Sequence, residues 1–72
     1  MTKLGEFLAK RSINRAAISR KTNINTTRLN ELSNNDSAKL RVDELYLIAL
    51  AIEVDPAELL AFVCSEVKLP KA

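Results

Sequence analysis

Hydrogen-bonding side chains dominate the segment from Thr26 to Glu31. Its sequence is Thr-Thr-Arg-Leu-Asn-Glu, so every residue except the leucine carries a side-chain group that can donate or accept a hydrogen bond. An ordinary surface helix would favour Glu and Lys, because Thr and Asn each cost a helix about a few tenths of a kcal/mol relative to Ala or Lys. The composition therefore indicates side chains that serve hydrogen bonding to a partner.

Two short helices joined by a tight turn are expected to position this segment. Asn14 and Asn25 can each cap the start of a helix through a side-chain oxygen, and residues 22–24 (Thr-Asn-Ile) break the chain between them. We therefore expect helices over residues 14–22 and 25–34. Such an arrangement suits the groove of a DNA duplex.

Each of these two helices has a single apolar side. Ile18 is the main apolar residue of the first helix, and Leu29 and Leu32 stand three residues apart in the second. Together with Ile24 these residues are expected to lie in the core. The polar side of the second helix then faces outward.

Residues 14–35 resemble the helix-turn-helix of the phage repressor and Cro family, also called the xenobiotic-response-element family. Ser19 stands at the family's small position, and Asn23 and Asn35 stand at its turn glycine and exit glycine. Asn tolerates the left-handed backbone conformation best among non-glycine residues, so we expect it at both asparagines. The resemblance covers nearly the full chain. It implies an all-α, compact five-helix lambda-repressor-like DNA-binding domain, with the helix-turn-helix formed by helices 2 and 3.

The resemblance also implies which residues meet DNA. The recognition helix would lie in the major groove, and Thr26, Thr27 and Glu31 occupy the base-reading positions, with Arg28 beside them. Thr can bond several bases, Glu can accept from cytosine N4, and Arg can take guanine or a phosphate. The implied phosphate contacts are Arg15, Asn25, Asn34, Lys39 and Arg41.

Each of these roles has a structural alternative. Thr26 and Thr27 can instead stabilise the start of the helix. Lys39 and Arg41 can belong to an ordinary solvated loop after the recognition helix. Phosphates repel Glu31 unless it meets a cytosine or an arginine such as Arg28, its i, i+3 neighbour.

Two further helices are expected over residues 3–11 and 42–52. The first contains Gly5, for which we favour a frayed helix end over a close approach of another backbone. The second has the strongest helical periodicity in the chain, in a stripe that consists of Leu45, Ile48, Ala49 and Ile52. A second apolar side, made by Tyr46, Leu47 and Leu50, predicts that this helix is sandwiched between the recognition unit and the last helix.

The last helix is expected over residues 56–67. Asp55 can cap it, Pro56 stands at its first position, and Glu58 can complete a capping box. Its apolar surface is broad for an end helix. We therefore take Phe62 and Val63 as the candidate dimer surface.

The residue inventory excludes most kinds of reactive site. With 72 residues and 47% hydrophobic content, the chain is expected to form one small domain over residues 1–72. It has no histidine and a single cysteine, and no glycine-rich loop is present. A zinc site, a nucleophile with an imidazole partner and a nucleotide cradle are therefore not expected. We expect neither enzymatic activity nor a cofactor.

The charges are strongly polarised along the chain. Residues 1–41 hold nine basic and three acidic residues, a net charge of +6, whereas residues 42–72 hold two basic and six acidic residues, a net charge of −4. A domain with this distribution would turn its amino-terminal half towards a polyanion.

Several features predict a cytoplasmic protein without a membrane segment. The longest apolar run, residues 45–52, is far shorter than the roughly 20 residues that span a bilayer, and the amphipathic start lacks the features of a secretory signal. The lone cysteine, Cys64, cannot form an internal disulfide and is expected to be a buried small hydrophobe.

Together these features predict a sequence-specific, double-stranded DNA-binding transcriptional regulator, with repression the favoured outcome. Because one such domain reads few base pairs, we expect a homodimer on a palindromic operator, with the paired recognition helices about 34 Å apart. The alternative is a protein-interaction module of the same fold, such as an antitoxin or a regulator subunit that binds a protein partner.

Overall fold

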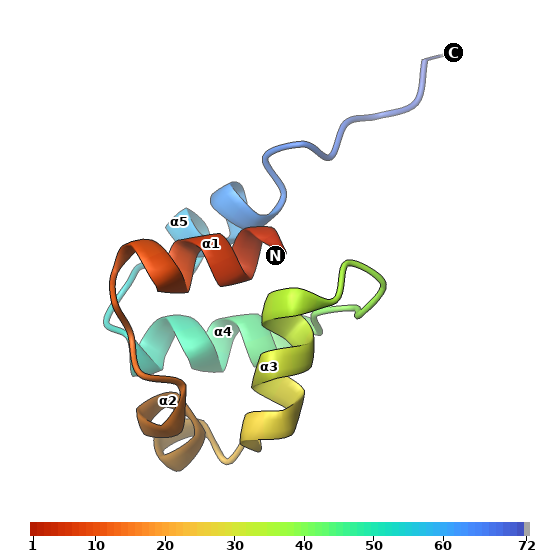
Figure 1. Cartoon of the computed structure of the whole chain (residues 1–72). Helices are drawn as coiled ribbons and strands as arrows, with labels where there is room; N and C mark the ends of the chain where they lie inside the picture. Colours follow the sequence, from red (N-terminus) through yellow and green to blue (C-terminus); the bar gives the residue numbers. More distant parts are fainter. Residues whose placement is uncertain (72) are drawn as a thin grey trace.

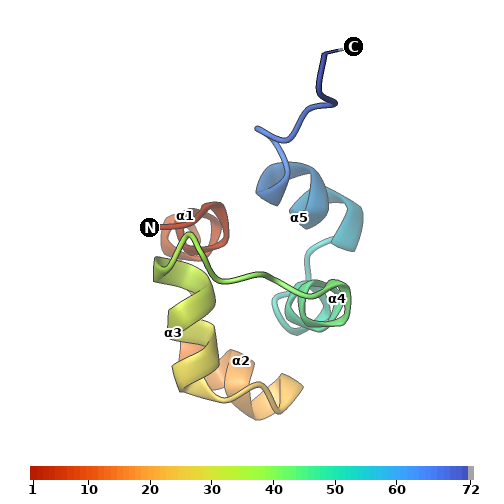
Figure 2. The same cartoon turned by 90° about the vertical axis from the view of Figure 1, so that its right-hand side faces the viewer.

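The computed structural model describes residues 1–71, which contain five α-helices (Figure 1). They are α1 (Lys3–Lys10), α2 (Arg15–Thr22), α3 (Thr26–Asn34), α4 (Val42–Ala51) and α5 (Pro56–Val63). This part of the chain contains no strand, so the all-α prediction is confirmed. Figure 2 shows α1 and α3 on one side of the molecule, α4 and α5 on the other, and α2 along the bottom.

Three helices begin at the capping residues predicted from the sequence, Asn14, Asn25 and Asp55, and α1 begins at Thr2. Four side-chain oxygens accept a backbone N–H at 2.7 to 3.1 Å, and they belong to Thr2, Asn14, Asn25 and Asp55. The capping box predicted at Glu58 is absent from the hydrogen bonds of α5, because this carboxylate instead accepts from Arg11 at 3.0 Å. At the start of α4, the Glu44 carboxylate accepts from the Arg41 N–H at 2.9 Å.

The last helix ends at Val63, earlier than the predicted end at residue 67. The N–H of Ser65 bonds the carbonyl of Phe62, and that of Val67 bonds the carbonyl of Cys64, so turns replace the helical pattern. Short helices depend on burying an apolar face, and residues 64–71 are exposed. Cys64, expected to be buried, is therefore exposed as well.

The core lies where the five helices meet, and α4 packs against both α2 and α5. Ile18, Leu29 and Leu32 are buried as predicted, and Ile24 is partly buried against them. The fully buried large apolar side chains are Leu8, Ile18, Leu29, Ile48 and Leu59. Each of the five helices therefore supplies at least one side chain to a single core.

As predicted, α4 lies between α2 of the recognition unit and α5, but the second apolar side on which that prediction rested is largely exposed. Tyr46, Leu47 and Leu50 are 53%, 39% and 54% exposed. The buried residues of α4 are three of the four in the predicted stripe, Leu45, Ile48 and Ala49, and the fourth, Ile52, follows the last residue of α4 and is partly buried. Because α2 and α5 both pack against that stripe, the opposite side of the helix stays uncovered.

The left-handed backbone positions agree only in part with the sequence. Asn23 ends α2 with φ 65° and ψ 12°, as expected at the turn. Asn35 has φ −106° and is extended, and its side chain accepts from the N–H of Ser37 at 2.9 Å to close a turn of its own. Ser12 and Glu53 also have positive φ, at 53° and 59°, where no glycine marks the position.

Gly5 is not at a frayed end, contrary to the interpretation favoured from the sequence. It is buried in α1, against the carboxyl end of α3. A Cβ built on Gly5 would overlap the backbone carbonyl oxygen of Ser33. That carbonyl also accepts the Thr2 N–H at 2.9 Å, so the absence of a side chain at Gly5 lets two backbones touch.

We expect Glu53→Gly to raise the free energy of unfolding by about 0.5–1 kcal/mol, because glycine removes the left-handed penalty at an exposed position. Urea unfolding followed by circular dichroism measures the change. Ala61→Gly, at an exposed helical position in α5, is the matched control and should lose up to about 1 kcal/mol. A loss of stability in Glu53→Gly would contradict the prediction.

Candidate nucleic-acid interface

The α2–α3 unit holds its two helices through the turn at Asn23. The Asn23 N–H bonds the Ser19 carbonyl at 2.9 Å, while the Thr22 hydroxyl donates to the Ile18 carbonyl at 2.8 Å and accepts from the Ile24 N–H at 3.2 Å. These local hydrogen bonds satisfy backbone groups at the carboxyl end of α2. They set the direction in which α3 leaves the turn.

The outer side of α3 carries four exposed polar residues, Thr26, Thr27, Asn30 and Glu31. Thr26 and Asn30 are i, i+4 neighbours, as are Thr27 and Glu31, so the four side chains form two adjacent rows on one helix surface. The predicted base-reading residues Thr26, Thr27 and Glu31 therefore lie together on an accessible surface.

Arg28 is bound within the chain, unlike its neighbours. Its Nε and Nη2 donate to the two carboxylate oxygens of Glu44 at 3.0 and 3.1 Å, and its Nη1 donates to Glu31 at 2.6 Å. Nη2 also donates to the backbone carbonyl of Lys39 at 2.9 Å. A base contact by Arg28, as the resemblance implies, would require these bonds to break.

The Arg28–Glu44 pair also makes local stability depend on pH. The hydrogen bond from Arg28 holds the pKa of Glu44 below its ordinary value, the Arg41 N–H adds to the effect, and burial opposes it. The carboxylates of Glu44 and Glu31 raise the pKa of Arg28, so its guanidinium stays charged. Because the pKa of the folded carboxylate is lowered, the pair stabilises the fold above the ordinary pKa of Glu and loses this effect as pH falls through the lowered value.

Asn30 is a further candidate contact, since the sequence placed it in the hydrogen-bonding segment but not among the base-reading positions. The first residue of α2, Arg15, donates from Nη1 to the Asn30 side-chain oxygen at 2.9 Å. With its oxygen engaged, Asn30 keeps its amide N–H groups as donors for a partner. Its position four residues after Thr26 is the signal that identifies it, because i, i+4 residues share one helix surface.

The predicted phosphate contacts lie at different places around α3. Asn25 and Asn34 mark its two ends, and both are exposed. Arg15 donates a hydrogen bond to Asn30, which lies in the middle of α3. Lys39 and Arg41 lie in the segment between α3 and α4, where Arg28 holds the Lys39 backbone and Arg41 pairs with Asp43 at 3.3 Å.

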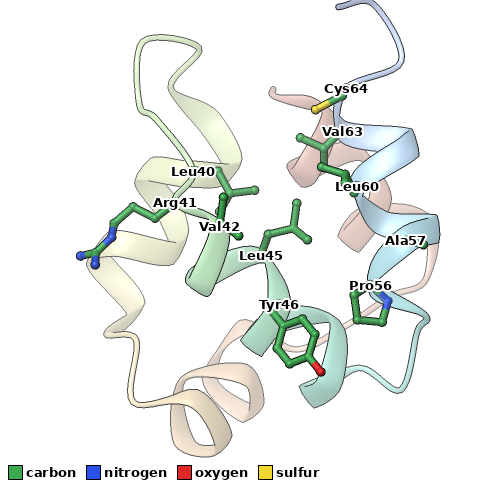
Figure 3. Close-up of a pocket in the computed structure, with 10 residues that line it drawn as sticks. All are labelled: Leu40, Arg41, Val42, Leu45, Tyr46, Pro56, Ala57, Leu60, Val63 and Cys64. Atoms are coloured by element: carbon green, nitrogen blue, oxygen red, sulfur yellow. The ribbon is translucent and has the colours of Figure 1, made fainter.

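A second accessible surface is an apolar groove of about 380 Å³ between α4 and α5 (Figure 3). Val63 lines it, as do the half-exposed side chains of Tyr46 and Leu60. Phe62 lies elsewhere, since its ring is partly buried against Phe7 with centroids 5.3 Å apart and ring planes at 62°. Of the two predicted dimer residues, Val63 lines this groove and Phe62 packs within the chain.

Residues 1–71 contain no group of His, Cys, Asp and Glu side chains that could hold a metal ion. None of the helices in this range has the length and apolar character needed to cross a bilayer.

Comparison with known proteins identifies one matching family. A family model described as Cro/C1-type HTH DNA-binding domain matches residues 3–65, a range that contains all five helices. Comparisons with curated proteins and with solved structures gave no match.

Proposed function

We propose that the chain, which belongs to the Cro/C1-type HTH DNA-binding domain family, is a sequence-specific repressor that acts as a homodimer on a palindromic operator. The observation that carries the proposal is the outward polar surface of α3, formed by Thr26, Thr27, Asn30 and Glu31. In this reading α3 enters the major groove and α2 crosses the phosphate backbone. The proposal includes no enzymatic activity and no cofactor, and it places the protein in the cytoplasm, on the nucleoid.

The side chains of α3 suit direct readout of base edges. Thr26 and Thr27 lie in the first turn, nearest the base edges in this docking mode, where hydroxyl groups can bond bases and Thr methyls can touch thymine. Asn30, whose amide donors remain available, can donate to base acceptors from the next turn. Glu31 pairs with Arg28, which lowers the repulsion between its carboxylate and the phosphates.

The charge distribution supports the same orientation. Residues 1–41 carry the net charge of +6, and they include α1, α2, α3 and the segment that leads to α4. Of the basic residues outside α3, Arg15 is hydrogen-bonded to Asn30 and Lys39 is held through its backbone by Arg28. They are the proposed main phosphate contacts, with Asn25, Asn34 and Arg41 in supporting positions.

The test of DNA binding is a selection of bound duplexes from a random library, followed by titration of the enriched sequence. The proposal expects an enriched inverted repeat whose half-site centres lie about one helical turn apart, because two-fold related recognition helices would be about 34 Å apart. A library that shows no enrichment at low salt would contradict it.

The proposed dimer surface is the α4–α5 groove, with a second copy as the partner. Leu60 lines the groove and is 51% exposed, and burying such residues is a common driving force for homodimers. We expect Leu60→Asp to shift the protein towards monomer in analytical ultracentrifugation while leaving the thermal unfolding of the monomer nearly unchanged. Ala61→Asp, exposed on the same helix, is the control. A monomeric parent protein, both free and on a full operator, would contradict the dimer.

The groove also favours one alternative, a protein-interaction module such as an antitoxin or a regulator subunit. Its apolar lining suits a protein partner as well as a second copy. The two functions predict different sensitive residues. Loss of activity on changing Arg15 and Lys39 supports DNA as the ligand, whereas loss of activity on Leu60→Asp alone, with operator binding intact, supports the alternative.

A further inference from the structure

We propose that Arg28 positions the DNA-reading surface and does not itself read a base. The proposal rests on the proposed DNA-binding function. It assigns to Arg28 the task of joining three parts of the chain, which are the first turn of α3, the start of α4 and the segment that carries Lys39.

The geometry around Arg28 is that of a clamp. Two N–H groups of its guanidinium donate to the two carboxylate oxygens of Glu44, and this bidentate pair fixes the orientation of the side chains as well as their distance. A third contact reaches Glu31, one turn further along α3, and a fourth reaches the Lys39 carbonyl. Arg28 thus donates to acceptors from α3, from α4 and from the segment between them.

Glu44 is held from two sides, which makes it a rigid anchor. Its side chain is only 12% exposed, whereas that of Glu31 is 49% exposed. The same Glu44 carboxylate that faces Arg28 accepts the Arg41 N–H at the start of α4. Because the anchor belongs to the packed core helix, Arg28 transmits the position of α4 to α3.

The clamp also places the segment between α3 and α4. Arg28 holds the Lys39 backbone, and Arg41, two residues later, directly precedes α4 and donates its N–H to Glu44. Both residues are proposed phosphate contacts. The clamp would therefore set the distance between these contacts and the base-reading row of Thr27 and Glu31.

Glu44→Gln separates the two roles of Arg28 because they predict opposite results. If Arg28 reads a base, the substitution removes one of the carboxylates that hold its guanidinium, so operator binding should stay equal or tighten. If Arg28 is a clamp, the reading surface loosens, and the ratio of specific to non-specific affinity should fall about three- to tenfold. The matched control is Glu58→Gln, which removes the same charge and breaks the Arg11–Glu58 pair outside the α2–α3 unit.

A second readout needs no DNA. Hydrogen exchange at the backbone amides of Ala38 and Arg41, which donate to the Asn35 carbonyl and to Glu44, should be about three- to tenfold faster in Glu44→Gln than in the parent protein, and unchanged in Glu58→Gln. Arg28→Lys should behave like Glu44→Gln, because an ammonium keeps the charge but cannot reproduce the fork.

The two readouts distinguish failure of the clamp from failure of DNA binding. Unchanged exchange in both Glu44→Gln and Arg28→Lys would overturn the clamp, as would tighter operator binding by Glu44→Gln. Faster exchange in both variants, together with a parent protein that binds no duplex, would uphold the clamp and remove the proposed function.

Discussion

Gly5→Ala is expected to lower the free energy of unfolding by about 2–3 kcal/mol, the upper range for overpacking a core. The new Cβ would meet the Ser33 carbonyl oxygen, and a backbone atom cannot rotate away as a flexible side chain can. The Thr2 N–H holds the same carbonyl, and the Thr2 hydroxyl donates to the Leu32 carbonyl at 2.7 Å. Relief therefore requires α1 and α3 to move apart.

The sign of this result is informative because helix propensity predicts the opposite. Alanine at a free helical position is favoured over glycine by up to about 1 kcal/mol. The control is Ala9→Gly, at an exposed position in the same helix, which should lose only that amount. Urea unfolding of both variants measures the difference, and a stabilised Gly5→Ala protein would show that the two backbones do not touch.

Replacing Arg15 and Lys39 together by glutamine is expected to weaken operator binding roughly 60-fold at about 0.1 M monovalent salt. Each lost phosphate contact reduces the counterion-release slope by about 0.9, which is nearly tenfold in affinity at this salt concentration. Glutamine at position 15 can still donate to Asn30, so the change removes charge and keeps a hydrogen-bonding group beside α3.

The measurement is a titration of the operator over a range of salt concentrations. The logarithmic slope should fall in magnitude by about 1.8 in the double variant. The control replaces Lys68 and Lys71 by glutamine, which removes the same formal charge from the exposed tail. Equal losses in both double variants would mean that net charge, rather than the placement of Arg15 and Lys39 beside α3, governs binding.

Local signals in the sequence were sufficient for the elements and for much of the core. The caps at Asn14 and Asn25 and the buried Leu29 and Leu32 follow from interactions within a few residues, and the structure confirms them. Asn23 adopts the left-handed conformation for the same kind of reason. The resemblance to the Cro-type family, confirmed over residues 3–65, rests on this pattern of short-range features.

Contacts between distant residues lay beyond the reach of local patterns. Arg28 and Glu44 are 16 positions apart, and only the tertiary fold, which brings the start of α4 within side-chain reach of α3, converts a candidate base reader into an internally paired side chain. Likewise, glycine is needed at position 5 because the Ser33 backbone lies against it, where a Cβ would overlap the Ser33 carbonyl oxygen.

The sequence by itself determined the five helices, the helix-turn-helix and the polar surface of α3, because these depend on the 3.6-residue period and on capping within one turn. Only the tertiary structure decided which apolar and charged side chains stay available. Phe62 packs on Phe7, while Tyr46 and Leu60 remain exposed. Periodicity shows that a helix surface is apolar or charged, but the neighbouring helices decide whether that surface is covered.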